Sequence, residues 1–150
     1  MNAPPNSETA ALAQRLGFVL APDLPGDAPG PLAGVKAALT WAASEGAEFL
    51  ATAPCDTPLL PDDLYPNLGA EIGDAAAAIA ETPDGPQALC GLWRVAALPA
   101  LAEALAGGRH PPVREALAGM NMRRVLFAEA GAFANLNTPD DLAALAARRP

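Results

Sequence analysis

Hydrophobic positions along the chain form short continuous runs separated by runs with helical spacing. The run that starts with Phe49-Leu50-Ala51 is short and apolar, as in a strand buried in a parallel sheet. It leads to Asp56, which lies between Pro54 and Pro58. Because each proline fixes its own φ and removes a backbone donor, the chain leaves the strand in a stiff extended turn. The pattern predicts that Asp56 is presented at the carboxyl edge of a sheet, where open α/β folds bind their ligands.

Strand-like and helical runs alternate along the rest of the chain. The predicted strands are Phe18–Leu20, Ala75–Ala80, Ala88–Trp93 and Met122–Phe127. The predicted helices are Ser7–Leu16, Pro31 to about Glu45, Leu64–Ile72, Ala96–Ala106, Pro112–Leu117 and a last helix that begins at Pro139 after the N-cap Thr138. Leu12, Leu16, Leu142 and Leu145 are expected on the buried faces of the first and last helices. The alternation predicts one α/β domain, residues 1–150, with a largely parallel sheet.

The composition narrows the class of protein. The chain has 150 residues and is 51% hydrophobic, which is enough apolar material for one core. No apolar run reaches the ~18 residues of a membrane helix, and the N-terminus lacks the pattern of a signal peptide, so we expect a soluble cytoplasmic protein. The net charge of −8 opposes broad binding to nucleic acid, which depends on clustered Lys and Arg.

Few residues suit nucleophilic, thiol or zinc chemistry. Cys55 and Cys90 lack the spacing of a metal site and are predicted to be buried, reduced thiols. His110 is the single histidine, has no nucleophile partner in the pattern, and is expected at the surface. Lys36 is the only lysine and lies in an amphipathic helical pattern, which predicts a solvated side chain. Trp93, at a strand end, is expected in the core.

Polar side chains suited to a ligand follow the predicted strands. Asp23 follows the first predicted strand, Asp56 the second, and Asn135 and Asn137 precede the last helix. A parallel sheet would bring these positions to one edge, where carboxylate and amide oxygens suit Mg²⁺. For Asp56 alone, an Asx-turn that accepts backbone N–H groups is an equal alternative.

The stretch Pro29–Gly34 opens a helix with little side-chain cover over its backbone. Free amides at a helix N-terminus can receive an anion, and glycines allow a ligand to approach closely. Gly30 and Gly34 are equally compatible with a tight turn and close helix packing alone.

Three stretches together resemble one family. They are Asp23 followed by Pro29-Gly30-Pro31-Leu32-Ala33-Gly34, then Pro54-Cys55-Asp56-Thr57-Pro58, then Asn135-Leu136-Asn137-Thr138-Pro139-Asp140-Asp141-Leu142. In order and spacing these stretches are similar to the molybdenum cofactor guanylyltransferase family, MobA. Gly91-Leu92-Trp93-Arg94 also resembles that family's following strand. The resemblance covers essentially the whole chain.

The resemblance implies a Rossmann-like, GT-A-like nucleotidyltransferase fold with three layers. It implies transfer of GMP from GTP to the terminal phosphate of the molybdenum–molybdopterin cofactor, with release of pyrophosphate and with molybdoenzymes as possible acceptors. By the same resemblance, Asp56 is the catalytic residue and holds Mg²⁺, which would neutralise charge on the α-phosphate. The residues implied at the nucleotide are Asn2, Asp23, Gly30, Pro31, Leu32 and Gly34, and those implied toward the pterin are Asn135 and Asn137.

The chain departs from this family at its start. Family members begin with a strand, a glycine-rich loop and a lysine that meets the triphosphate, whereas Met1-Asn2-Ala3 resembles the end of the family's second strand. We therefore expect an N-terminally truncated fold with exposed sheet edges and a weakened triphosphate site. Three explanations stay open: a start codon assigned too late, a split protein completed by another chain, and a degenerate remnant.

Other functions stay open as well. The same fold would serve a cytidylyltransferase of this cofactor or a sugar-phosphate nucleotidyltransferase. A non-catalytic, cofactor-binding remnant or partner subunit is favoured by the missing lysine and opposed by the intact motif around Asp56.

Overall fold

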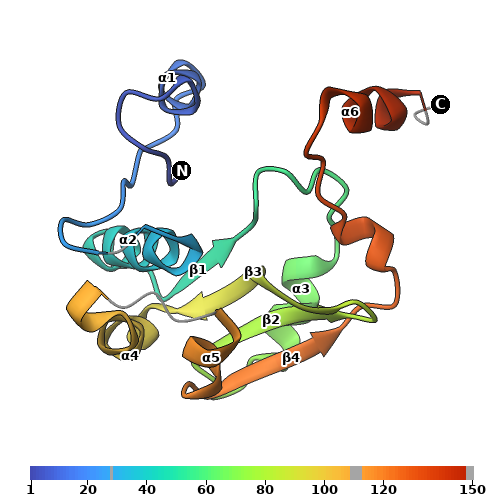
Figure 1. Cartoon of the computed structure of the whole chain (residues 1–150). Helices are drawn as coiled ribbons and strands as arrows, with labels where there is room; N and C mark the ends of the chain where they lie inside the picture. The colour runs from blue at the N-terminus through green and yellow to red at the C-terminus, as the bar shows by residue number, and fades with distance from the viewer. Residues whose placement is uncertain (28, 109–112, 148–150) are drawn as a thin grey trace.

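One mixed sheet organises the chain. A computed structural model describes residues 1–27, 29–108 and 113–147. The strands β1 (Phe49–Thr52), β2 (Ala77–Thr82), β3 (Gly85–Arg94) and β4 (Met122–Leu126) form a sheet in the order β1-β3-β2-β4 (Figure 1). The helices are α1 (Glu8–Arg15), α2 (Pro31–Ser44), α3 (Leu64–Glu71), α4 (Leu98–Ala104), α5 (Val113–Ala118) and α6 (Pro139–Ala146), with the 3₁₀ turns η1 (Val95–Ala97), η2 (Ala106–Gly108) and η3 (Ala130–Phe133).

Strands β1, β2 and β4 run in the same direction, and β3 runs against them. β3 pairs antiparallel with both β1 and β2, and β2 pairs parallel with β4. The predicted parallel character therefore holds for the direction of three strands, but only the β2–β4 pairing is parallel. β3 is reversed because a tight turn joins it to β2 as a hairpin. The carboxyl ends of β1, β2 and β4 consequently lie at one edge of the sheet.

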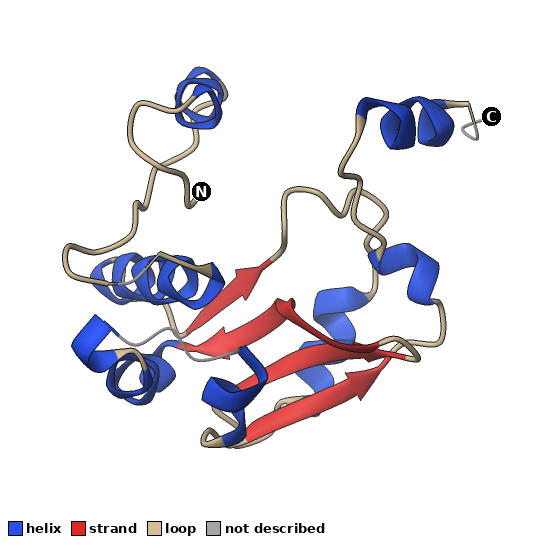
Figure 2. Cartoon of the chain, in the orientation of Figure 1, coloured by secondary structure: helices blue, strands red, loops and turns tan. Residues whose placement is uncertain are grey.

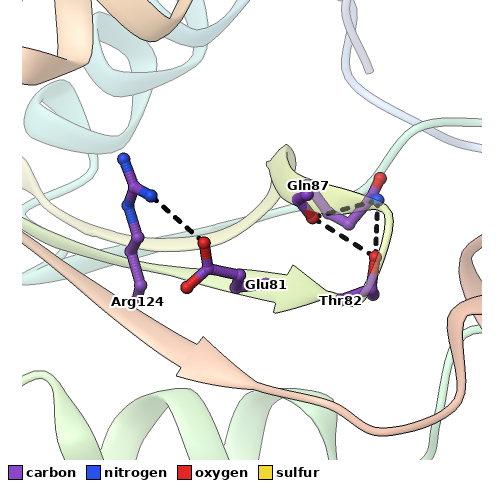
Figure 3. A network of polar contacts seen from close by, with 5 residues as sticks. Glu81, Thr82, Gln87 and Arg124 are labelled. Atoms are coloured by element: carbon purple, nitrogen blue, oxygen red, sulfur yellow. Dashed lines mark hydrogen bonds and ion pairs between the residues drawn. The ribbon is translucent and has the colours of Figure 1, made fainter.

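Side chains hold this hairpin and the neighbouring strand. The Gln87 Nε2 donates to the Thr82 hydroxyl (3.2 Å), and that hydroxyl donates to the Gly85 carbonyl (3.2 Å) (Figure 3). Gly85 has a φ of 120°, which favours glycine. On the adjoining strand, Arg124 forms an ion pair with Glu81 at 3.1 Å.

Helices cover both faces of the sheet (Figure 2), which confirms the predicted three-layer α/β class. Alternate residues of β2 face opposite sides. Ala77 and Ile79 join a core beneath α2, α4 and α5, whereas Ala78 and Ala80 join a core with α3. Trp93 is fully buried in the first core, as predicted.

The predicted strand Phe18–Leu20 is wrong. The segment is a loop, and Phe18 and Val19 are more than half exposed. The Phe18 amide donates to the Ala13 carbonyl of α1 (2.9 Å). Toward a possible neighbouring strand, the backbone meets the N-terminus: Met1 N donates to the Val19 carbonyl (2.6 Å), and Ala21 N donates to the Met1 carbonyl (3.0 Å). Two hydrogen bonds with one short segment do not make a ladder, so the β propensity of these residues is not realised.

The predicted buried face of the first helix is also wrong, and that of the last helix is wrong for Leu142, whereas Leu145 is half-buried. Leu12 and Leu16 are exposed, and α1 packs through Ala10 and Ala13 instead. Leu142 on α6 is exposed too. Both helices project from the sheet on the side of the loop that follows β1 (Figure 1), so they offer little surface for packing. The predicted N-cap Thr138 is confirmed, and with Asp141 it forms a capping box on α6. Ser7 is the N-cap of α1.

Some predictions fall outside the described residues. They concern His110, the helix start at Pro112 and the C-terminal tail Arg148–Pro150. Within the described ranges, no helix has the length and apolar character needed to cross a membrane.

Candidate functional site

The turn after β1 presents Asp56 at the carboxyl edge of the sheet. Thr57 is buried, and its hydroxyl donates to the Pro54 carbonyl (3.1 Å), which closes the turn between the two prolines. The N–H of Leu136 donates to the Asp56 carbonyl (2.7 Å). This bond brings Asn135 and Asn137, which flank Leu136, next to Asp56. The predicted meeting of Asp56 with Asn135 and Asn137 is therefore confirmed. Asp23, predicted at the same edge, instead bonds to Asn2, because the strand expected before it is a loop.

A thiol and a phenol lie beneath this turn. Burial, and then the negative charge of Asp56, raise the pKa of the Cys90 thiol to about 11. The Tyr65 hydroxyl donates to the Thr52 carbonyl (3.0 Å) at the end of β1. Burial, and then Cys90, raise the pKa of Tyr65. The Asp56 carboxylate thus lies above two groups that stay neutral at pH 7.

A second polar group forms around the N-terminus. The Asn2 Nδ2 donates to the Asp23 carboxylate (2.9 Å) and to the Ala21 carbonyl (2.8 Å). A Cβ at Gly34 would lie 2.6 Å from the Asn2 Oδ1, so the Asn2 side chain rests on the bare backbone of α2. Asn2, Asp23 and Gly34 are therefore brought together. Gly34 serves close packing here, as one of the two sequence interpretations allows.

The start of α2 lies nearby. Gly30 is the N-cap without a side-chain cap, and its carbonyl accepts from the amides of Ala33 (3.0 Å) and Gly34 (3.3 Å). Pro31 has no amide hydrogen to donate. The Leu32 side chain is buried in the core, so Leu32 can offer a ligand only its backbone.

A cavity of about 640 Å³ separates the two polar groups. The N-terminal segment forms one wall, β1 and its following turn form the other, and α2 contributes Gly34, Val35, Ala38 and Trp41. Asp23 bonds to the lining residue Asn2, and Asp56 directly follows the lining residue Cys55. Among the described residues no hydrogen bond joins the two groups, so they flank the cavity without closing it.

Two residues differ from the sequence predictions. Cys55 is exposed, because it lies in the turn beyond the strand; only Cys90 is buried. Lys36 is not solvated: its Nζ lies 2.6 Å from the Asp27 Oδ1, and the side chains are only 17% and 9% exposed. Asp27 was not singled out from the sequence. Asp27 lies in a Pro/Gly loop, nine residues before Lys36, and no local sequence pattern links the two residues.

Asp56 offers carboxylate oxygens to a ligand or a metal ion. Within the described part of the chain, no group of three or more His, Cys, Asp or Glu side chains is placed to hold a metal ion. A metal bound at Asp56 would therefore complete its shell with water, amide oxygens or ligand phosphates, which suits Mg²⁺.

Comparison with known proteins decides the family. Residues 1–125 match the profile of the MobA-like NTP transferase domain. The chain belongs to this family. The MobA-like match contains Asn2, Asp23, the start of α2 and Asp56, and it ends before Asn135 and Asn137.

The similar proteins share one name, and the match to this chain spans only part of each of them. A molybdenum cofactor guanylyltransferase from Cereibacter sphaeroides (strain ATCC 17029 / ATH 2.4.9) is 46% identical over 114 residues, 76% of this chain and 58% of that protein. A protein of the same name from Rhodobacter capsulatus is 40% identical over 129 residues, 85% of this chain and 65% of that protein. The chain thus spans less than two thirds of these relatives.

Solved structures agree on the fold. Molybdopterin-guanine dinucleotide biosynthesis protein A from Archaeoglobus fulgidus superposes with a TM-score of 0.74 at 22% identity, over 99% of this chain and 78% of that chain. 4-Diphosphocytidyl-2C-methyl-D-erythritol synthase superposes with a TM-score of 0.66 at 16% identity. These likenesses confirm the predicted nucleotidyltransferase fold.

Proposed function

We propose that this chain carries the nucleotide and cofactor site of a molybdenum cofactor guanylyltransferase. The reaction is transfer of GMP from GTP to the terminal phosphate of the molybdenum–molybdopterin cofactor, with release of pyrophosphate. The observation that carries the proposal is the bond between Leu136 and Asp56, which joins two of the family-like motifs at the carboxyl end of β1. Membership of the MobA-like family and the names of the relatives support the same reaction.

Each polar group has a role in this proposal. Asp56 holds Mg²⁺, and the bound ion neutralises charge on the nucleotide phosphates. Asn2 and Asp23 contact the nucleotide from the opposite wall of the cavity, with the backbone of Gly30, Pro31 and Leu32 alongside. Asn135 and Asn137 face the pterin substrate. The protein then acts mainly by positioning the two substrates and by stabilising charge.

The charge of the chain restricts how phosphates are held. The net charge is −8, and the only lysine, Lys36, is paired with Asp27. Lys36 is therefore engaged elsewhere, so the metal and backbone amides would bear most of the interaction with a triphosphate. We propose that further polypeptide completes the triphosphate site, and that molybdoenzymes accept the product.

Isothermal titration of the chain with GTP and Mg²⁺, repeated with CTP, tests the proposal. We expect GTP to bind more tightly than CTP, and we expect removal of Mg²⁺ to abolish binding. The matched variant is Asp56→Asn, which removes the charge, keeps the size, and leaves the backbone carbonyl that Leu136 uses. Mg²⁺-dependent affinity should fall about tenfold or more in this variant. Unchanged GTP affinity in Asp56→Asn would overturn the metal assignment.

The alternatives have distinct outcomes when the titration is repeated with molybdopterin as well. Tighter binding of CTP would favour a cytidylyltransferase. Binding of molybdopterin with no binding of either nucleotide would favour a non-catalytic, cofactor-binding subunit.

A further inference from the structure

The loop between Asp23 and α2 is held at two points. At the first, the Asn2 Nδ2 donates to the Asp23 carboxylate (2.9 Å). At the second, the Lys36 Nζ donates to the Asp27 Oδ1 (2.6 Å). Neither Lys36 nor Asp27 is among the residues that line the cavity. The Lys36–Asp27 pair therefore acts on this loop from outside the candidate site.

A tight turn joins the two points. The N–H of Asp27 donates to the Leu24 carbonyl (3.1 Å), and Pro25 and Gly26 are the two central residues of the turn. Gly26 has a φ of 87°, which is typical of the third residue of a type II turn, and proline suits the second. Because both central residues are restricted, the turn has little freedom to absorb a movement of Asp27. Asp23 directly precedes the turn and would move with it.

The Asp27 carboxylate depends on Lys36. The two side chains are only 9% and 17% exposed, respectively. The Asp27 Oδ2 is buried and has no hydrogen-bond partner among the described residues. A buried carboxylate that loses its cation is costly, so without Lys36 the carboxylate would turn toward water. That movement would carry the turn, and Asp23 with it, away from Asn2.

We propose that Lys36 and Asp27 are a positioning pair, which holds Asp23 against Asn2 and thereby sets the affinity for the nucleotide. Helix α2 supports both points of the loop, because the bare backbone of Gly34 carries the Asn2 side chain and Lys36 holds Asp27 two residues further on. One rigid helix thus fixes the distance between them. The effect on the nucleotide rests on the proposed function, whereas the coupling between the pair and Asn2 does not.

The variant Asp27→Ala tests this coupling. It removes the buried carboxylate, and the long Lys36 side chain can then extend to water, so the fold should be retained. Without nucleotide, we expect the NMR signals of the Asn2 side-chain amide to shift, because Asp23 is no longer held in place. In titration calorimetry with Mg²⁺, we expect the affinity for GTP to fall about tenfold.

Two further variants separate positioning from stability. Ile72→Ala removes a buried side chain from the core that contains α3, so it should lower the midpoint of urea denaturation at least as much as Asp27→Ala. Its affinity for GTP should nevertheless stay within about twofold, with an unmoved Asn2 signal. The double variant Lys36→Met/Asp27→Leu replaces the ion pair by an apolar contact, and it should restore the affinity to within about threefold.

An unmoved Asn2 signal in Asp27→Ala would overturn the inference. Equal losses of GTP affinity in Asp27→Ala and Ile72→Ala would overturn it as well, since the effect would then follow stability alone. If the unaltered chain does not bind GTP, the proposed function fails instead. The Asn2 signal in Asp27→Ala then decides by itself whether the pair positions Asp23.

Discussion

Cys90 makes the stability of the protein depend on pH in the alkaline range. Burial and the Asp56 charge raise its pKa from the ordinary 9.0 to about 11 in the folded state. The folded state therefore retains the thiol proton over a range in which the unfolded chain loses it. Its contribution to stability is complete below pH 9 and is lost as the pH rises toward 11.

We predict that the free energy of unfolding falls by about 2–3 kcal/mol across this range because of Cys90. Urea denaturation at a series of pH values measures the effect. The control is Cys90→Ala, because this variant lacks the thiol and keeps Tyr65 and Lys36. The pH dependence should be shallower in Cys90→Ala. Parallel curves for the two proteins would contradict the assignment. Asp56→Asn should lower the pKa of Cys90 but leave it above 9.0, since burial is the larger cause.

The Lys36–Asp27 pair is the most buried ion pair among those of the described residues. The Asp27 Oδ2 is buried and has no hydrogen-bond partner in the described part of the chain, so Lys36 alone compensates this carboxylate. Loss of one partner of such a pair leaves an uncompensated charge in an apolar setting. The pair also fixes the loop between Asp23 and the start of α2.

We predict that Lys36→Met lowers the free energy of unfolding by about 3 kcal/mol, and that adding Asp27→Leu recovers most of the loss. The matched control is Arg124→Met, which breaks the more exposed pair with Glu81 (Figure 3) and should cost less than about 1 kcal/mol. Thermal and urea denaturation provide the values. Equal losses in Lys36→Met and Arg124→Met would show that burial of the Lys36 pair contributes little.

Helix α2 links the N-terminal polar group to the rest of the fold through Gly34. Asn2 can bond to Asp23 and rest on α2 only because residue 34 has no side chain. Gly69 in α3 offers a comparison, since a Cβ there would meet Leu92 at 3.8 Å, an ordinary contact. Both glycines lie in helices, and they differ in the space that a Cβ would find.

We predict opposite effects of alanine at these two positions. Gly69→Ala should raise the free energy of unfolding by about 0.5–1 kcal/mol, because alanine favours helix. Gly34→Ala should displace the Asn2 side chain and break its bond to Asp23, which lowers GTP affinity. Urea denaturation measures the result for Gly69→Ala, and NMR shifts of the Asn2 side-chain amide with titration of GTP measure the result for Gly34→Ala. An unmoved Asn2 signal in Gly34→Ala would contradict this packing.

The elements could be predicted where local residues decide them. Ser7, Thr138 and Pro139 mark helix starts by capping chemistry, and the structure confirms them. The strand at Phe49 is also decided locally, by its short apolar run. The strand predicted at Phe18–Leu20 failed because a strand needs a neighbour, and sequence pattern does not say whether one is present.

The candidate site likewise combines features that local residues decide with features that tertiary packing decides. The turn around Asp56 follows from two prolines, and its approach to Asn135 and Asn137 was expected from strand ends. The Lys36–Asp27 pair and the Asn2 contact with Gly34 could not be predicted, because they depend on how a loop and a terminus fold over α2. Such contacts are set by tertiary packing.

The molecule as a whole has two polar groups on opposite walls of one cavity. In the proposed function a nucleotide spans them, with its phosphates and Mg²⁺ near Asp56 and its nucleoside near Asn2 and Asp23. This arrangement is the central claim of the proposed function. It fixes where a paramagnetic ion bound with GTP should lie.

The most direct test is an NMR titration of the isotope-labelled chain with GTP and Mn²⁺ in place of Mg²⁺. A paramagnetic ion broadens amide signals in its neighbourhood. We predict selective broadening at Asp56 and Leu136, which are hydrogen-bonded to each other, with a shift but less broadening at Asn2. The same broadening should be lost in Asp56→Asn. Broadening that is centred on the acidic start of α6, or that is unchanged in Asp56→Asn, would contradict a nucleotide–metal site at the end of β1.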